Sequence, residues 1–304
     1  KRTSVCVIDD DGQTLHEQEC ESTLPALQCA ISPFPTQRIA LIAVEAGTST
    51  EIVTKLRRAG FPVAMFEARK ASKFLAVRRN KTDAGDAKGL ADLARLGRNT
   101  ISRVYLKSPE CQQISGQLAL RKKLVQLRVA IEGVVRSKLA LHGRELQFGC
   151  GHGAFRSAVE EEIASIKEEA DGADLADDLR PLVTIAEGLR DYLRTLDAKL
   201  ERLAASHDVC RLLMDVPGVG PICSLSFYSA VEDPSRFRSP ADVGAYLGLV
   251  PRRYQSGRVS KSVGITKTGS KLTRASLFTA ATVFGFRAPD CALKDWYTSL
   301  RQRA

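Results

Sequence analysis

Two long runs of mainly apolar residues at heptad spacing constrain the fold of this chain more than any other feature. The first run comprises Leu120, Leu124, Leu127, Ile131, Val134, Lys138 and Leu141. The second comprises Leu182, Ile185, Leu189, Tyr192, Leu196, Lys199 and Leu203. Alternating steps of four and three residues are typical of long helices that pack along an apolar seam. We therefore expect residues 105–205 to form a long coiled-coil insert, either as a hairpin within the chain or as a seam between two copies.

The segment before this insert, residues 1–104, alternates between strand and helix patterns. SVCVIDD and TLHEQECE flank the dipeptide Asp11-Gly12, which is typical of a two-residue hairpin turn. RIALIAVEA is a continuous apolar run and predicts a buried central strand, and PVAMFEA predicts a further strand. Helices are expected at STLPALQCAIS, at TEIVTKLRRAG and in KTDAGDAKGLADLARLG. These elements indicate an α/β domain, in which helices flank a mixed sheet.

The segment after the insert, residues 206–304, predicts a mostly helical domain. It contains the glycine-rich stretch VPGVGPICS and ends in the apolar helix pattern ASLFTAATVFGF. Between them, residues 250–274 hold seven Lys or Arg residues and no Asp or Glu. A surface of one sign is unusual for a soluble domain and is suited to contact phosphates.

The overall charge and the cysteines narrow the function classes. The chain of 304 residues has a formal net charge of +10, which favours a polyanionic partner such as nucleic acid. Its eight cysteines include no C-x-x-C pair, so we expect reduced thiols rather than a zinc ribbon. Among the cysteines, only Cys150 could belong to a metal site, together with His152. Two ligands in a glycine-rich stretch favour a plain loop. No apolar run approaches the length of a membrane span, so we expect a cytoplasmic, nucleoid-associated protein.

Three acidic residues are candidate metal ligands. Glu45 closes the apolar run RIALIAVEA, at the edge of the sheet where α/β sites usually form. Asp83 and Asp86 are three residues apart and therefore share one face of a helix. Such an all-oxygen set suits Mg²⁺ or Mn²⁺, and paired ions of this kind support phosphodiester chemistry. The alternative is that Thr82 or Asp83 caps the helix and that the acids only complement its dipole.

Two further segments are candidates for nucleic-acid chemistry. VPGVGPICS matches a helix-hairpin-helix-like motif, in which Gly218 and Gly220 let backbone N–H groups approach a phosphate; a plain glycine-rich helix turn is the alternative. Ser256 lies in a predicted loop beside Gly257, between Arg252-Arg253 and Arg258-Lys261, whose arginines would stabilise charge on phosphorus. It is either a nucleophile or a residue that only hydrogen-bonds a phosphate or forms a turn. Ser260 and Ser262 are nearby alternatives.

These motifs together resemble those of one family. The order is LIAVEAG, KTDAGDA, a coiled-coil insert, PGVGP, RFRS and YLGLVPRRYQSGRVSKSVGITKTGSKLTR. The chain is thereby similar, over nearly its whole length, to the insertion-sequence 110 family of transposases, which are bridge-RNA-guided DNA recombinases related to the Piv DNA invertases. The most specific parts of the resemblance are KTDAGDA and the long basic segment.

The resemblance implies an RNase H or RuvC-like domain over residues 1–104 with a DEDD set of metal ligands. Glu45, Asp83 and Asp86 match the last three members. The first Asp of the set belongs to a strand that would precede Lys1, and Asp9 is a weak substitute beside the turn. The family's C-terminal domain usually continues further, so this chain also looks shortened at that end.

The resemblance further implies the chemistry and the partners. Ser256 matches a catalytic serine that attacks a DNA phosphodiester, with metal-bearing acids from another subunit assisting. The implied partners are double-stranded donor and target DNA, a structured bridge RNA, and further copies of the chain in a dimer or tetramer. Candidate phosphate contacts are Arg252, Arg253, Arg258, Lys261, Lys267 and Lys271. The rival functions are a metal-dependent junction-resolving nuclease that uses water, and a non-catalytic nucleic-acid scaffold.

Overall fold

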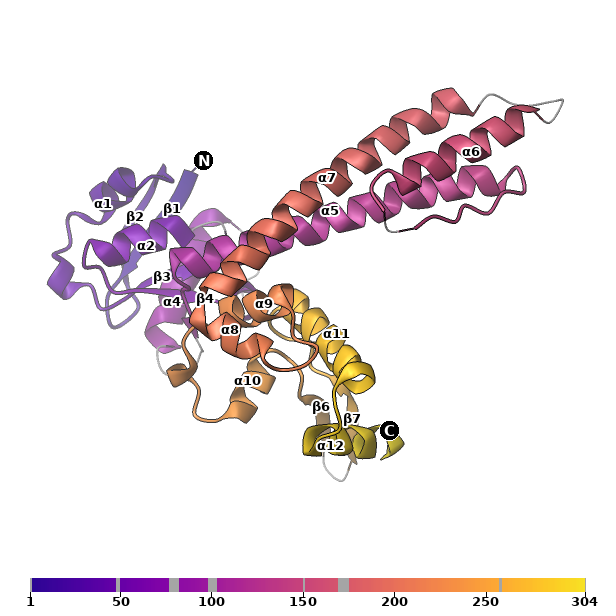
Figure 1. Cartoon of the computed structure of the whole chain (residues 1–304). Helices are drawn as coiled ribbons and strands as arrows, with labels where there is room; N and C mark the ends of the chain where they lie inside the picture. The colour runs from indigo at the N-terminus through magenta and orange to yellow at the C-terminus, as the bar shows by residue number, and fades with distance from the viewer. Residues whose placement is uncertain are drawn as a thin grey trace. The chain divides into compact units, whose positions relative to one another are not determined.

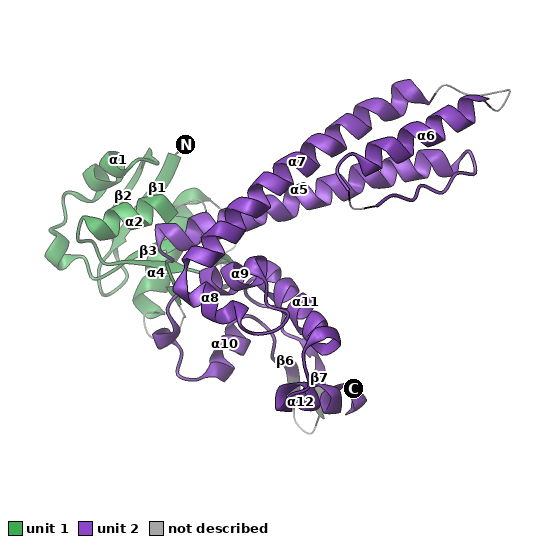
Figure 2. Ribbon diagram, viewed as in Figure 1, with its two compact units in different colours: residues 1–106 green, residues 107–304 purple. Residues whose placement is uncertain are grey.

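The computed structural model describes residues 2–47, 50–76, 82–97, 103–149, 151–168, 175–256 and 259–303. The chain divides into two compact units, residues 1–106 and 107–304, which Figure 2 colours green and purple. The sequence predicted one boundary before residue 105 and a second before residue 206. The structure has a single division, which falls after Leu106. The insert and the C-terminal segment thus form one unit, and each unit is described by itself below.

Unit 1 is a small α/β assembly (Figure 1). Its strands are β1 (Arg2–Ile8), β2 (Thr14–Glu21), β3 (Ile42–Glu45), β4 (Val63–Phe66) and β5 (Arg103–Val104). Its helices are α1 (Leu24–Ile31), η1 (Thr36–Arg38), α2 (Thr50–Arg58), α3 (Ala68–Leu75) and α4 (Asp83–Leu96). The predicted hairpin is present, because β1 and β2 pair antiparallel. Residues 9–13 connect the two strands, so the expectation of a two-residue turn at Asp11-Gly12 was wrong: the side chain of Asp9 stabilises a longer turn. β3 and β4 pair parallel, and β5 runs antiparallel to β4.

The buried centre of the second sheet is β4 rather than β3. All four residues of β4 are buried, whereas β3 lies at the sheet edge and its residues are half-buried or exposed. The strand is also shorter than the predicted run, since it begins only at Ile42. The expectation of a central strand there was therefore wrong for the described residues, because no strand pairs with the second edge of β3 among them. Helix α4 packs on both β1 and β3.

Unit 2 is mainly helical (Figure 1). Its helices are α5 (Pro109–Ala140), α6 (Ala154–Glu168), α7 (Ala176–Ser206), α8 (Asp208–Met214), α9 (Pro221–Val231), η2 (Pro234–Arg236), α10 (Pro240–Tyr246), α11 (Lys271–Arg287) and α12 (Ala292–Arg303). Its strands are β6 (Pro251–Ser256) and β7 (Val259–Ile265), which pair antiparallel. The prediction of a mostly helical C-terminal segment is confirmed, with this hairpin as the exception.

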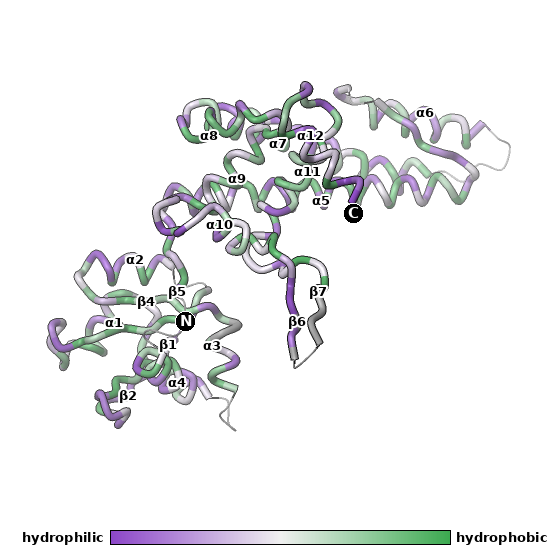
Figure 3. The backbone as a smooth tube through the Cα atoms, turned by 90° about the horizontal axis from the view of Figure 1, so that it is seen from below, coloured by the Kyte–Doolittle hydropathy of each residue, from purple (hydrophilic) through white to green (hydrophobic). Residues whose placement is uncertain are grey.

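The two long predicted helices are present as α5 and α7, which pack side by side (Figure 1). At one end α6 joins them in a core that contains Leu139, Phe155, Val159, Leu179 and Val183. At the other end α5 and α7 pack with α8 and α9. Figure 3 shows how apolar and polar residues alternate along α5.

Only part of the α5 heptad pattern lies in the core of the chain itself. Leu124 and Ile131 pack against the two cores. The other apolar members lie on the surface and are 43% to 79% exposed: Leu120, Leu127, Val134 and Leu141. Helix α5 thus carries two apolar faces, one of which has no partner among the described residues.

Candidate active site and nucleic-acid interface

The acidic pair of KTDAGDA lies in the first turn of α4. Thr82 is the N-cap, and its Oγ1 accepts a hydrogen bond from the N–H of Gly85 at 3.0 Å. Asp83 is exposed and Asp86 is half-buried. The N-cap prediction for Thr82 is confirmed. Because Thr82 caps the helix, the carboxylates of Asp83 and Asp86 are not needed as caps. Helix capping and metal binding are therefore compatible at this position.

Glu45 ends β3, the strand on which α4 packs, and its side chain is exposed. Glu45 and the two aspartates are thus on adjacent elements of unit 1. Within the described residues, however, no three Asp, Glu, His or Cys side chains lie close enough together to hold a metal ion. The donor chemistry fits Mg²⁺, which commonly takes only one or two carboxylates and completes its octahedron with water and substrate phosphates. Asp83 and Asp86 fit that smaller set.

A cavity of about 390 Å³ adjoins Asp83, between the start of α4 and the β1–β2 hairpin. Glu17 and Glu19 of β2 line it together with Asp83. Glu19 pairs with Arg2 at 3.0 Å, and Glu17 accepts a hydrogen bond from Cys6 Sγ at 3.6 Å. These two glutamates are not among the predicted ligands, although the alternation of acids at positions 17, 19 and 21 is a pattern that places them on one face of the strand.

Asp9 is engaged in the hairpin turn. Its Oδ1 accepts the backbone N–H groups of Asp11 at 3.0 Å and Gln13 at 2.8 Å. Helix α4 fastens the same turn, because Lys88 Nζ donates to Gly12 O at 2.6 Å and Arg95 donates to the carbonyl of Asp10. These contacts give the Asp9 carboxylate a structural role in the turn, and they lend no support to Asp9 as a substitute metal ligand.

The glycine-rich turn lies between α8 and α9, as predicted. Gly218 has a φ of +89°, and a Cβ there would lie 2.5 Å from Ala280 O and 2.9 Å from Phe284 N of α11. Gly218 is therefore required for close packing of the turn on α11. Gly220 differs, since it is the N-cap of α9 and its Cβ direction is open. Of the two glycines, Gly220 has the space that a phosphate contact would need.

Ser256 ends strand β6, so the expectation of a loop there was wrong. Its backbone pairs with Val259 across the two-residue connection 257–258. Tyr254 and the β-branched residues Val259, Val263 and Ile265 favour strands on both sides of Gly257, which agrees with the hairpin. Gly257 and the predicted phosphate contact Arg258 lie outside the described residues. In Figure 3 β6 is drawn as a hydrophilic strand.

The other predicted phosphate contacts lie in this hairpin or shortly after it in the sequence. Arg252 and Arg253 are exposed on β6, and Lys261 pairs in register with Tyr254. Lys267 follows β7 with a φ of +57°, and Lys271 is exposed at the first position of α11. An antiparallel two-stranded ribbon of this kind has dimensions that fit the major groove of duplex DNA.

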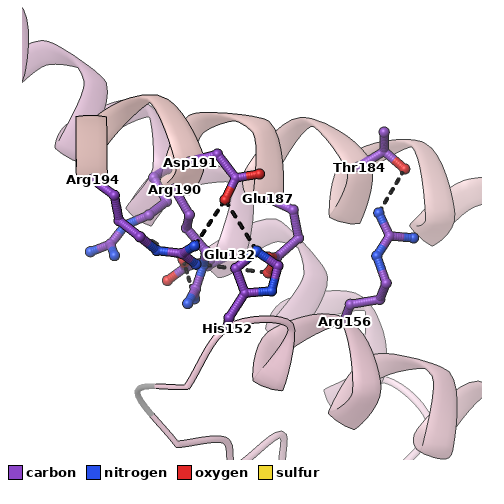
Figure 4. A network of polar contacts seen from close by, with 9 residues as sticks. Glu132, His152, Arg156, Thr184, Glu187, Arg190, Asp191 and Arg194 are labelled. Carbon is purple, nitrogen blue, oxygen red and sulfur yellow. Dashed lines mark hydrogen bonds and ion pairs between the residues drawn. The ribbon is translucent and has the colours of Figure 1, made fainter. Parts of the chain in front are cut away.

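The possible metal pair near the 149–153 loop gains no support. Cys150 lies outside the described residues, and His152 Nε2 lies 3.4 Å from Asp191 of α7 (Figure 4). The same view shows Arg194 on Asp191 and Arg190 beside Glu132. This network ties the loop to the helix pair. None of the described helices is long and apolar enough to cross a membrane.

Comparisons with known proteins agree with this arrangement. The family described as "Transposase IS116/IS110/IS902 family" matches residues 210–296, and the DEDD transposase family of IS110 matches residues 1–142. The transposase for insertion sequence element IS1111A of Coxiella burnetii is 25% identical over 280 residues, which cover 91% of this chain and 73% of that protein. A putative transposase of Sinorhizobium fredii is 29% identical over 245 residues, which cover 80% of this chain and 60% of that protein.

A third relative is named for gene inversion. The pilin gene-inverting protein of Moraxella bovis is 36% identical over 76 residues, which are 25% of this chain and 24% of that protein. Both family matches are to transposases, and they contain the acids of unit 1 and the basic hairpin of unit 2. The chain is thus similar to the IS110 transposases over both candidate site segments, residues 1–142 and 210–296.

Proposed function

We propose that this chain is a DNA recombinase that moves a mobile element by cleaving and rejoining DNA. One observation carries the proposal: each family match contains one half of a possible active site. The match over residues 1–142 contains Glu45, Asp83 and Asp86, and the match over residues 210–296 contains Ser256 and its basic surroundings. The chain spans 73% and 60% of the first two relatives, so the activity of the whole protein is part of this proposal.

Ser256 is the proposed nucleophile. Its hydroxyl loses a proton to a base, an Oγ–P bond forms, and the P–O bond to the leaving deoxyribose oxygen breaks while that oxygen takes up a proton. The backbone register separates the three candidate serines along the hairpin, because Ser256 pairs with Val259, Ser260 with Gln255 and Ser262 with Arg253. Only Ser256 lies directly beside the connection, where a hairpin can approach a backbone phosphate.

The test is covalent capture. A nicked suicide duplex is incubated with the wild-type chain and with Ser256→Ala, and Ser260→Ala serves as the matched control. We expect a protein–DNA adduct from the wild type and from Ser260→Ala, and none from Ser256→Ala. An adduct with Ser256→Ala would exclude this serine, and cleavage without any adduct would favour the water-dependent nuclease.

Metal binding is the second part of the proposal. Asp83 and Asp86 are placed by a capped helix start, and Glu45 ends the strand below it. Mg²⁺ bound here would supply a Lewis acid for the phosphate oxygens. Asp83→Asn and Asp86→Asn should abolish strand cleavage in Mg²⁺ while DNA affinity stays within about twofold. Normal recombination by both variants would favour the non-catalytic scaffold.

Guidance by RNA is the third part. The chain carries seven Lys or Arg residues and no acid over residues 250–274, which gives a long surface for sugar–phosphate backbone of either nucleic acid. A structured bridge RNA would then provide sequence choice by base pairing, as in other RNA-guided systems. The check is the purified protein from cells that carry the element: a specific co-purifying RNA is expected. Recombination at full rate by RNA-free protein would contradict guidance.

Self-association is the fourth part. The exposed face of α5 repeats every seven residues at Leu120, Leu127, Val134 and Leu141, which is the spacing of a helix–helix seam. We propose that a second copy covers it. Leu127→Glu and Val134→Glu should then dissociate the assembly in sedimentation experiments, whereas Val129→Glu, exposed but off this seam, should not. An unchanged sedimentation coefficient for the seam variants would exclude α5 as the interface.

A further inference from the structure

Unit 2 contains a cavity of about 570 Å³ between α5, the turn before α9, and α11. Three elements far apart in the sequence form its walls. Apolar walls come from Leu118 and Val125 of α5 and from Leu272 and Ala275 of α11. Arg121 and Lys122 also line it, and no acidic residue does. A concave site of this size, mostly apolar with a few polar groups, is typical of a small-ligand site.

The walls of this cavity are held in place before any ligand arrives. Gly218 packs directly against the backbone of α11 at Ala280, so the turn cannot move away from the helix without losing that contact. Arg121 is fixed by two hydrogen bonds to Asp197 of α7, at 2.5 and 3.0 Å. Preformed walls lower the entropic cost of binding.

The charges in the cavity are not balanced. The guanidinium of Arg121 is matched by Asp197, but no acidic side chain pairs with its neighbour Lys122 in the part of the chain that the structure describes. Lys122 is half-buried at the cavity wall. The cavity therefore combines apolar surface with one uncompensated positive charge, which favours a ligand with an apolar body and an anionic group.

We propose that this cavity binds one nucleotide that is unpaired and turned out of its stack, with the base between the apolar walls and the phosphate near Lys122. The inference rests on the proposed function, because it requires a nucleic acid on unit 2. Unpaired nucleotides in RNA loops or in distorted DNA have little stacking left to lose, so binding them costs less than extracting a paired base. Ser276 and Thr279 line the same wall. Their hydroxyl groups donate to the carbonyls of Leu272 at 3.1 Å and Ala275 at 3.0 Å, so each oxygen can accept a hydrogen bond from an N–H at the edge of a base.

The experiment uses short duplexes with one bulged 2-aminopurine, made as RNA and as DNA, and the same duplexes without the bulge. Ala275→Leu and Thr279→Leu fill the cavity, and Ala281→Leu is the control, since Ala281 is exposed on α11 and does not line it. Lys122→Gln removes the unpaired charge, and Lys123→Gln is its control on the exposed surface.

We expect the wild type to prefer one bulged probe by at least about tenfold, the value that one stacked base contributes. Ala275→Leu, Thr279→Leu and Lys122→Gln should lose this preference and the change in 2-aminopurine fluorescence, while both controls keep them. Affinity for the fully paired duplex should stay constant in the cavity-filling variants. Matched melting temperatures show that the variants are folded.

Three outcomes would overturn the inference, and they differ from one another. Equal binding of bulged and paired probes would contradict the nucleotide site in the cavity but leave nucleic-acid binding by the chain intact. Binding of neither probe would contradict the proposed function as well. Equally tight, saturable binding of free 2-aminopurine nucleotide, blocked by Ala275→Leu, would assign the cavity to a free nucleotide instead of a strand.

Discussion

The carboxylate of Glu232 accepts the backbone N–H of Ser108, which lies 124 residues earlier in the chain, at 2.9 and 3.2 Å from its two oxygens. Ser108 is the N-cap of α5, and Glu232 follows the last residue of α9 with a φ of +60°. With a ψ of −69°, Glu232 lies outside the left-handed helical region, in a sparsely populated conformation that costs a residue other than glycine about 1–3 kcal/mol. The contact therefore holds the start of α5 on α9 against local backbone strain.

This pair gives opposite expectations for two substitutions of Glu232. Glu232→Ala loses the charge-assisted hydrogen bond and keeps the strain, so unfolding free energy should fall by about 1.5–3 kcal/mol. Glu232→Gly loses the same hydrogen bond but relieves the strain, so its loss should be smaller by at least about 1 kcal/mol. Urea unfolding of both variants measures the difference. Equal destabilisation would show that the positive φ carries no cost here.

The two glycines of the PGVG turn should differ in their tolerance of a methyl group. Gly218→Ala places a Cβ against the backbone of Ala280 and Phe284 and also strains a φ of +89°, so we expect a loss of more than about 2 kcal/mol. Gly220→Ala meets open space and should cost less than about 1 kcal/mol. Thermal unfolding of the two single variants tests this ranking. The reverse order would mean that the turn does not rest on α11.

The sequence predicted local elements well and long-range relations poorly. The hairpin at Asp11-Gly12 and the cap at Thr82 depend on a few neighbouring residues, and both are present. The burial of β3 depends on which strands flank it, and a continuous apolar run does not contain that information. The contact between Glu232 and Ser108 joins distant segments and leaves no pattern in either. Asp83 and Asp86 could be found by spacing, whereas the glutamates across the cavity required the register of the hairpin.

The loop that was expected at Ser256 had a readable contrary signal. Tyr254, Val259, Val263 and Ile265 favour strands and lie on both sides of Gly257, where the chain forms β6 and β7. The positive charge of this segment suggested a loop instead. Charge reports what a segment can bind, whereas residue pattern is the more direct signal of secondary structure.

The cysteines should separate by reactivity. Cys29 and Cys291 are exposed, whereas Cys111 and Cys210 have no exposed surface and burial raises the pKa of both thiols above the usual 9.0. Iodoacetamide near pH 8 should therefore modify the first two quickly and the other two only on unfolding. Mass spectrometry of peptides gives the rates. Fast labelling of Cys210 in folded protein would contradict its burial.

The same shift in pKa gives the sign of a pH effect. A thiol with a raised pKa in the folded state stays protonated there after the unfolded thiol has ionised. Its stabilising contribution is complete below about pH 9 and decreases as the pH rises through the folded pKa. Unfolding free energies from about pH 8 to about pH 10 should therefore fall more steeply for the wild type than for the double variant Cys111→Ala/Cys210→Ala. Parallel curves would contradict the shift.

The ion pair between Arg190 of α7 and Glu132 of α5 is nearly buried, so substitution of either partner alone should lower the free energy of unfolding. Arg190 donates to Glu132 at 2.7 Å, and both side chains are nearly buried, at 11% and 8% exposure (Figure 4). The guanidinium also lies 5.2 Å from the ring of Phe148 and 5.1 Å from that of Phe155. Removing one partner leaves the other with only a longer ion pair, either Glu132 with Arg128 at 3.6 Å or Arg190 with Glu187 at 3.7 Å. Arg190→Met or Glu132→Leu should therefore each cost about 3 kcal/mol, the lower end of the range for a broken buried pair.

The double variant Arg190→Met/Glu132→Leu removes both charges and keeps apolar volume between the helices, so its loss should be well below the sum of the two single losses. Denaturant unfolding of the wild type, both single variants and the double variant completes the cycle. Arg180→Met with Glu160→Leu provides the control cycle, because that pair is largely exposed and its coupling should stay below about 1 kcal/mol. Additive losses at Arg190 and Glu132 would mean that water reaches this pair and that the loop packed on it does not seal the end of the helix pair.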